Sequence, residues 1–205
     1  MQNFSKRNGA TESANLAHGV LPREMILDGS RFTDWGLASA LLEVFPKNAT
    51  VLDLGCGLGL YARFFHRAGY HVIAIEGGEI TGSEAFYPIF REDLTEPLSW
   101  PGVALAERNN SVLCLEVGEH IPAIYETVFL DNITRYARRL VLSWAIPGQG
   151  GFGHVNEQPN EVIKAAIQCR GFNFNDEVTS RLRGAVGDYC WYFRNTLMVF
   201  DAQEA

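Results

Sequence analysis

Two hydrophobic periodicities alternate along this chain. In some stretches apolar residues recur every three or four positions, which is typical of a helix with one buried face. In others they form short runs rich in Val, Ile and Leu, which is typical of a strand buried on both sides. Helical spacing predicts helices over residues 35–45, 60–68, 79–86, 122–136 and 160–169. Short apolar runs predict strands over residues 50–54, 70–75, 89–91, 111–115 and 140–144.

Prolines and glycines support these boundaries. Pro46 closes the first predicted helix, Gly69 ends the second, and Pro122 stands near the first turn of the fourth. Strands that alternate with helices imply a mostly parallel sheet covered on both faces. Residues 172–181 and 189–200 follow without a helix between them, and we expect them to form an antiparallel terminal pair. The pattern therefore predicts an α/β fold.

A chain of 205 residues fits one domain. The beginning of the chain is rich in Asn, Ser, Thr and Ala without a sustained period, so we expect a flexible N-terminal arm over residues 1–25. The region of the first helix follows over residues 26–48, the core over 49–200 and a short tail over 201–205. All four parts belong to a single predicted domain.

Composition and charge narrow the function classes. A hydrophobic content of 47% is that of a packed globule, and a net charge of −7 opposes binding to nucleic acid, which relies on Lys and Arg clusters. The first 25 residues lack an apolar secretory segment, and no stretch reaches the roughly 18 uninterrupted apolar residues of a membrane span. We therefore expect a cytoplasmic protein that binds neither nucleic acid nor a membrane. The sequence makes no prediction about oligomeric state.

The cysteines give no sign of a metal site. They are widely spaced, with no C-x-x-C pair and no histidine at ligand spacing. The four are Cys56, Cys114, Cys169 and Cys190. Elsewhere, His154 and Glu157 are two possible ligands without a third. We expect free thiols in a reducing compartment and no bound metal.

The strongest chemical signal directly follows the first predicted strand. The segment Asp53-Leu-Gly55-Cys-Gly57-Leu-Gly59 has glycines two positions apart, where ligands bind in open parallel sheets. Glycines allow positive φ and let a ligand approach without meeting a Cβ, and the following helix offers unpaired N–H groups. A dinucleotide-binding motif needs a glycine at position 60, where this chain has Leu60, which disfavours NAD and FAD.

Residues 51–59, Val-Leu-Asp-Leu-Gly-Cys-Gly-Leu-Gly, resemble the first motif of class I S-adenosylmethionine-dependent methyltransferases. Glu76 follows the second predicted strand, where that family has an acid that holds the ribose hydroxyls. Asp93 stands where the family commonly has an acid near the adenine amino group. Residues 114–122 are similar to the segment of ubiquinone-type O-methyltransferases that has a Glu-His pair ahead of a helix. The resemblance covers residues 50–145 and, by topology, extends to about residue 200.

This resemblance implies a Rossmann-like, three-layer α/β/α sandwich with a mostly parallel, seven-stranded sheet and a terminal antiparallel hairpin. It also implies S-adenosylmethionine as the cofactor. The residues to which it assigns cofactor binding are Asp53, Gly55, Cys56, Gly57, Gly59, Glu76, Gly77, Asp93, Leu94 and Glu116.

Two histidines are candidates for a general base, because both follow strands whose carboxyl ends would face the cofactor. The ordinary pKa of His120 suits a base at neutral pH, and Glu116 or Glu119 could orient it; alternatively, His120 packs at the start of the next helix. His154 lies in a glycine-rich loop over 147–158 that either closes over a substrate or is a solvated connector. The predicted catalytic residues are His154, His120 and Glu119.

The predicted function is an enzyme that transfers a methyl group from S-adenosylmethionine to a small-molecule or glycan-like acceptor, with oxygen as the methylated atom. One alternative is N-methylation of a small molecule or a protein side chain. Another is a cofactor-binding protein of the same fold without catalysis. Asp34 with Trp35, and the aromatic residues within 189–193, either line an acceptor pocket or belong to the core.

Overall fold

Strands and helices alternate along most of the chain. The structure is a computed structural model, and it describes residues 19–29, 33–98 and 110–204. Its strands are β1 Thr50–Leu54, β2 His71–Glu76, β3 Ile89–Arg91, β4 Asn110–Cys114, β5 Arg139–Leu142, β6 Phe172–Phe174 and β7 Met198–Ala202. Its helices are α2 Arg23–Gly29, α3 Trp35–Val44, α4 Leu60–Arg67, α5 Glu126–Arg135, α6 Asn160–Gln168, α7 Asp176–Gly184 and α8 Phe193–Thr196, with the short 3-10 helices η2 Gly118–His120 and η3 Ala123–Tyr125.

The strands form one sheet in the order β3-β2-β1-β4-β5-β7-β6. The first five strands run parallel to one another, and β7 lies antiparallel between β5 and β6. This topology confirms the predicted α/β class and the antiparallel terminal pair. β2 pairs with one edge of β1, and β4, later in the chain, pairs with the other edge. The strand order therefore reverses between β1 and β4, where sheets of this kind bind ligands.

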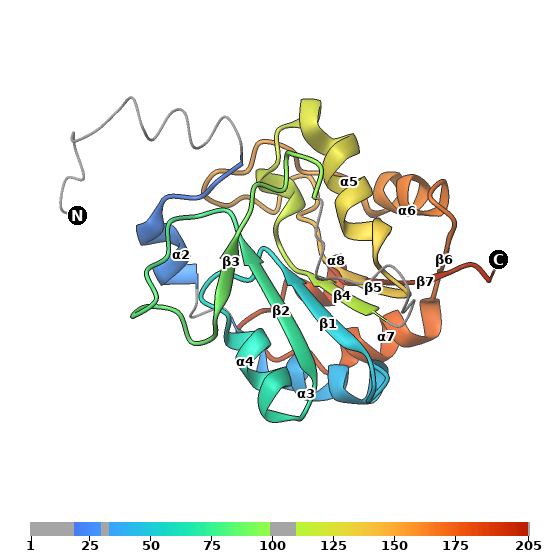
Figure 1. Cartoon of the computed structure of the whole chain (residues 1–205). Helices are drawn as coiled ribbons and strands as arrows, with labels where there is room; N and C mark the ends of the chain where they lie inside the picture. The colour runs from blue at the N-terminus through green and yellow to red at the C-terminus, as the bar shows by residue number, and fades with distance from the viewer. Residues whose placement is uncertain (1–18, 30–32, 99–109, 205) are drawn as a thin grey trace.

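Helices cover both faces of the sheet, with α3, α4 and α7 on one face and α5 and α6 on the other (Figure 1). Because successive strand residues point to opposite faces, Val51 packs with α3 and α4 while Leu52 and Leu54 pack with α5 and α6. The predicted three-layer α/β/α sandwich is confirmed. Within the described segments, no helix has both the length and the apolar surface needed to cross a membrane.

Asp34 fixes the start of the first predicted helix. Its carboxylate accepts a hydrogen bond from the Leu37 N–H (2.8 Å) and so caps α3. It also accepts a bond from the Gly187 N–H (2.8 Å), which joins α3 to the segment before α8. Asp34 is therefore a structural residue, and neither it nor Trp35 lines the cavity described below.

The prediction of a helix over residues 79–86 is wrong. The segment forms turns in which the N–H and hydroxyl of Thr81 both bond to the Glu84 carboxylate (3.0 and 2.8 Å). Such bonds also occur where helices start, but here only a single turn forms. Glu84 also pairs with Arg23, and the Phe86 N–H bonds to a carbonyl of the loop after β1 (2.8 Å). The segment therefore links α2 to the glycine loop.

The pattern predicts that residues 172–181 and 189–200 are extended throughout, and this part of the prediction is wrong. Only their outer ends form β6 and β7, and the segment between contains α7 and α8. Asn175 caps α7 by accepting a hydrogen bond from the Val178 N–H (3.0 Å). Leu182, four residues after Val178, packs into the core. With so few apolar positions, α7 carries little hydrophobic periodicity.

Smaller differences concern element ends. The strand predicted over 140–144 ends at Leu142, and the helix predicted over 122–136 begins with η3 before it becomes α5. The tail predicted over 201–205 begins inside the sheet, because β7 continues through Ala202. Asp201 holds this end by an ion pair with Arg139 (2.6 Å). Residues 1–18 of the predicted arm lie outside the described residues, whereas its last part belongs to α2, which the pattern did not predict.

Candidate functional site

A cavity of about 520 Å³ opens beyond the carboxyl ends of β1 and β4. Its walls come from α2, the glycine loop after β1, the ends of β2 and β3, the segment after β4, the loop after β5 and the residues around the start of α8. The predicted site residues that line it are Asp53, Gly55, Cys56, Gly57, Glu76, Gly77, Asp93, Leu94, Glu116, Glu119, His120 and His154. Of the predicted set, Gly59 does not line it.

The loop after β1 requires its glycines. Gly55, Gly57 and Gly59 have φ values of 75°, 55° and 75°, in the region that side chains disfavour. A Cβ at Gly55 would also lie 2.3 Å from Cγ2 of Val117, in the segment after β4. Gly59 is the residue before α4, so its contribution is to turn the chain into that helix. The backbone is thus exposed to the cavity at the end of β1.

Glu76 at the end of β2 is held by backbone N–H groups. Its two carboxylate oxygens accept bonds from Gly57 (2.9 Å) and Gly78 (3.0 Å). Burial raises the pKa of Glu76, and these N–H bonds only partly oppose the rise. Because a carboxylate has about four lone-pair sites, Glu76 can keep both bonds and still accept hydroxyl donors from a ligand.

Asp53 lies in β1 with only 4% of its surface exposed, and its Oδ2 has no hydrogen-bond partner among the described residues. Burial raises its pKa to about 7; a backbone hydrogen bond from Ala62 opposes this rise and the nearby charge of Glu76 adds to it. The Ala62 bond connects the strand to the first turn of α4. Asp53 therefore supports the start of that helix as well as the cavity wall.

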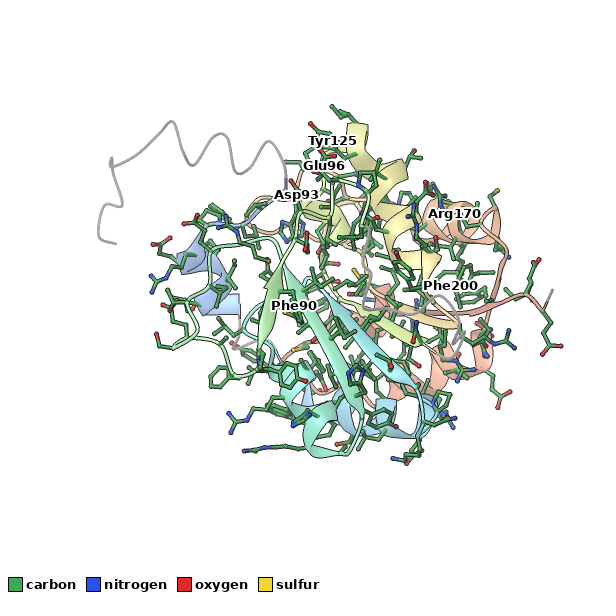
Figure 2. The ribbon with its side chains drawn as sticks, in the orientation of Figure 1. Phe90, Asp93, Glu96, Tyr125, Arg170 and Phe200 are labelled. Carbon is green, nitrogen blue, oxygen red and sulfur yellow. The ribbon has the colours of Figure 1, made fainter. Side chains whose placement is uncertain are left out.

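Asp93 lies just past the end of β3 (Figure 2). Its Oδ1 accepts bonds from the N–H and the hydroxyl of Thr95 (2.8 and 2.7 Å), which fixes the chain as it leaves the strand. Leu94 is buried beside it and adds apolar surface to the cavity. Cys56, in the glycine loop, has its thiol pKa raised by burial, so it stays protonated and is a poor nucleophile.

Glu116 directly follows β4 and has a φ of 52°, the only positive value at a non-glycine residue in the described part of the chain. Such a conformation costs free energy and is common at functional sites. The Glu116 N–H donates to the Ser143 hydroxyl (2.8 Å), and its carboxylate accepts bonds from Gln149 (2.7 Å) and Thr196 (3.4 Å). Burial raises the pKa of this carboxyl group.

Glu119 and His120 lie in η2, three and four residues further on. Glu119 has no exposed surface, and its pKa is raised by burial and then by the charge of Glu116. The Nδ1 of His120 lies 3.2 Å from the carbonyl oxygen of Gly153, and burial lowers the pKa of His120 to about 4. The ring is therefore neutral at pH 7. His120 lies in η2, ahead of η3 and α5, and lines the cavity.

The loop after β5 is organised around Glu157. Its carboxylate accepts bonds from the N–H groups of Gly148 and Gly150 (both 2.8 Å) and lies 2.9 Å from Nδ1 of His154. The bond with His154, followed by the backbone bonds, lowers the pKa of Glu157. The rings of His154 and His120 lie edge to face with centroids 5.1 Å apart. The fold thus brings the two predicted histidines together.

Several cavity residues carry no signal in the sequence. Met25 and Ile26 come from α2, a helix too short to show a period. Gln149 bonds to Glu116 from the opposite loop, a contact that only the fold reveals. Of the aromatic residues in doubt, Trp191, Tyr192 and Phe193 line the cavity and Tyr189 does not.

Solved structures of the same architecture cover nearly all of this chain. The 1,6-didemethyltoxoflavin-N1-methyltransferase of Burkholderia thailandensis, with 1,6-didemethyltoxoflavin and S-adenosylhomocysteine bound, aligns over 98% of this chain and 94% of its own, with a TM-score of 0.61 and 15% identity. This chain has the class I methyltransferase fold. The magnesium protoporphyrin IX methyltransferase of Synechocystis PCC 6803, with bound S-adenosylhomocysteine, shares the methyltransferase fold over 99% of this chain and 90% of its own (TM-score 0.56, 17% identity).

The methyltransferase fold also occurs with another named chemistry. The cyclase SpnF aligns over 82% of this chain and 80% of its own, with a TM-score of 0.57 and 15% identity. No protein-family model and no curated protein matches the sequence. The likeness to these structures establishes the methyltransferase fold alone.

Proposed function

We propose that this chain binds S-adenosylmethionine and transfers its methyl group to an oxygen atom of a small-molecule acceptor. The observation that carries the proposal is the placement of Glu76, a carboxylate held by the glycine loop at the wall of the cavity. The two adjacent hydroxyls of a ribose suit a carboxylate with lone pairs to spare. Two solved structures of the same fold contain S-adenosylhomocysteine.

The remaining cofactor contacts follow from the position of Glu76. Asp93 and Leu94 lie beyond the next strand, where they would hold the adenine by its amino group and its apolar face. Gly55 and Gly57 leave room for the cofactor to pass close to the backbone. Glu116 lies on the side of β4 and would supply a negative charge to the cofactor's amino group. The donor thus spans the cavity from β3 to β4.

Methyl transfer requires mainly alignment. The acceptor hydroxyl gives up its proton, its oxygen forms a bond to the methyl carbon, and the carbon–sulfur bond breaks to leave the neutral thioether of S-adenosylhomocysteine. The protein holds oxygen, carbon and sulfur in line and excludes water, and it receives or directs the proton. We assign proton removal to the wall formed by His154, His120 and Glu119, which face the cavity from the loops after β4 and β5.

The acceptor side of the cavity is apolar and aromatic. Phe152 and Trp191 are 53% and 55% exposed, so they lie at the mouth of the cavity. Met25 and Tyr192 also line the cavity. A cavity of this size and character suits a small, partly apolar molecule beside the cofactor. The two methyltransferases compared above are also named for small molecules.

A second candidate is a protein of the methyltransferase fold that binds the cofactor without methyl transfer. The observation that favours it is the likeness to the cyclase SpnF. Nitrogen as the methylated atom is a further alternative, and the didemethyltoxoflavin enzyme is named for N1-methylation.

One experiment separates these candidates. The purified chain is incubated with S-adenosylmethionine carrying a ¹³C-labelled methyl group and a fractionated metabolite extract, and S-adenosylhomocysteine is measured. We expect extract-dependent release of S-adenosylhomocysteine and a product whose methyl carbon has the chemical shift of an O-methyl group. An N-methyl shift would move the assignment to nitrogen. Cofactor binding without turnover in any fraction would favour the binding protein.

A further inference from the structure

Three potential metal ligands meet on one wall of the cavity. Glu119 and His120 come from η2 after β4, and His154 comes from the loop after β5. A carboxylate oxygen and one ring nitrogen from each histidine lie within 4.8 Å of one another. The two loops are fixed to each other, because the N–H groups of Val155 and Asn156 both bond to the Glu119 carbonyl oxygen (2.9 and 3.0 Å). The arrangement is therefore built into the backbone.

The carboxyl group of Glu119 is poorly compensated. It is fully buried, neither of its oxygens has a well-aligned hydrogen-bond partner among the described residues, and the backbone groups of Glu119 and Ala145 only partly oppose the rise in its pKa. The charge of Glu116 lies close enough to raise its pKa further. In the part of the chain that the structure describes, no Lys or Arg forms an ion pair with either carboxylate. An acid buried in this way stays protonated unless a cation accompanies it, and a bound cation would stabilise its ionised form.

Each histidine has a hydrogen-bond acceptor at its Nδ1, as metal-ligating histidines commonly have. The Nδ1 of His120 faces the Gly153 carbonyl oxygen, and the Nδ1 of His154 faces the carboxylate of Glu157. These partners only accept hydrogen bonds, so each Nδ1 carries the proton and each Nε2 carries the lone pair. Nε2 of His154 lies 4.0 Å from Oε1 of Glu119. A second partner that fixes the tautomer in this way is the usual support of a metal-bound histidine.

We propose that Glu119, His120 and His154 bind a divalent transition-metal ion at the wall of the cavity. Two imidazoles and one carboxylate favour Zn²⁺ or Mn²⁺ over Mg²⁺, which prefers oxygen ligands throughout. Ligands at about 2.1 Å from a tetrahedral ion are roughly 3.4 Å apart, so binding requires the three groups to approach by about 1 Å. The side facing the cavity leaves a coordination position for another molecule.

The sequence alone predicts no metal site, because His154 and Glu157 lack a third ligand there. The fold changes the assignment of both residues. Glu157 becomes the hydrogen-bond partner that orients His154, and the other ligands come from a segment more than thirty residues earlier in the chain.

The consequence for the acceptor rests on the proposed function. An acceptor hydroxyl in the cavity would occupy the open position through its oxygen, which lowers the pKa of the hydroxyl. With the ion bound, Glu119, His120 and His154 would act in proton removal through the metal, and the proton would pass to solvent before methyl transfer. The site therefore selects acceptors with an ionisable hydroxyl, such as a phenol or an enol.

The test is a metal titration that does not depend on the methyl donor. The full-length, untagged protein is freed of metal with a chelator and titrated by calorimetry with ZnCl₂, MnCl₂ and MgCl₂. We expect one saturable site for Zn²⁺ or Mn²⁺, and weaker binding of Mg²⁺. Glu119→Gln and His154→Ala should each weaken binding more than about 100-fold, and Glu157→Gln by about 10- to 100-fold. Absence of saturable Zn²⁺ and Mn²⁺ binding would overturn the proposal.

A matched control is His71→Ala, since His71 is exposed at the opposite end of β2 and should leave metal binding unchanged. Glu119→Gln should also melt no lower than the wild type without metal, because the amide, like the protonated carboxyl group, is neutral and similar in size, and it should lose the rise in melting temperature that the metal gives the wild type. Metal binding that survives Glu119→Gln and His154→Ala equally would contradict the site. Metal binding without any binding of S-adenosylmethionine would instead leave the metal site standing and refute the proposed function.

Discussion

The carboxyl group of Asp53 has a pKa near neutrality in the folded protein, so its protonation state changes with pH in the physiological range. Burial raises its pKa to about 7, whereas the same group in the unfolded chain titrates near 3.8. The folded state therefore binds more protons between these values, and the stability contributed by this group is complete at low pH and is lost as the pH rises through 7. The difference of about three pKa units corresponds to about 4 kcal/mol as an upper bound.

This linkage predicts the behaviour of Asp53→Asn. The amide keeps an oxygen for the Ala62 N–H but cannot ionise, so the variant should gain stability over the wild type at about pH 8 relative to about pH 5. Urea unfolding at the two pH values measures the difference. Asp188→Asn, at an exposed residue, is the control and should show the same effect at both. A pH-independent effect of Asp53→Asn would show that Asp53 is ionised throughout.

His154 carries the sharpest prediction about turnover. Because it faces the cavity near His120 and Glu119, His154→Ala should lower kcat about 100-fold or more while changing the Kd for S-adenosylmethionine less than about 3-fold. The comparison is made by steady-state kinetics and calorimetry on the same preparation, with His71→Ala beside it. Unchanged turnover in His154→Ala would remove this residue from the catalytic assignment.

At the residue scale, the sequence predicts the donor side of the site better than the acceptor side. Gly55, Gly57 and Glu76 belong to one short stretch of chain, so their spacing already indicates a shared role. The meeting of Glu119 with His154 depends instead on two backbone hydrogen bonds between loops that are remote in sequence. No local pattern reports such a contact.

Among the elements, α7 illustrates a helix that capping specifies more than hydrophobic spacing. Asn175 accepts the Val178 N–H bond at its start and donates to Asp201 of β7 (2.8 Å). Asn175→Ala should therefore lower the free energy of unfolding by about 1–2 kcal/mol, measured by urea denaturation. Asn173→Ala, at an exposed position two residues earlier, should cost much less. Equal effects of the two changes would contradict the capping account.

The elements that the pattern predicts well are those with long apolar faces. The strands β1, β2, β4 and β5 and the helices α3, α4, α5 and α6 follow from periodicity, since each buries apolar residues in the core, whereas β3 is short and mostly exposed. The errors fall where polar side chains decide the local structure. In the segment 79–86 the Phe86 N–H bonds to the glycine loop, so the turn that Glu84 closes does not continue as a helix. Asn175 starts a helix in a stretch that reads as extended.

For the molecule as a whole, the order of the strands converts scattered sequence signals into one site. The loops after β1, β2 and β3 line one part of the cavity, to which we assign the methyl donor, and those after β4 and β5 line the adjoining part. The alternation of helices and strands predicts that these loops share an edge of the sheet. It does not predict that α2 and the residues before α8 complete the walls, because neither has a periodic signal.

The central claim is that the cavity holds S-adenosylmethionine through Glu76. It is tested most directly by calorimetric titration of the full-length protein with S-adenosylmethionine, for the wild type, Glu76→Gln and the exposed control Glu43→Gln. We predict saturable binding at one site per chain, a loss of affinity of about 10-fold or more in Glu76→Gln, and no change in Glu43→Gln. A folded wild type that does not bind the cofactor, or a Glu76→Gln variant that binds it equally well, would contradict the account.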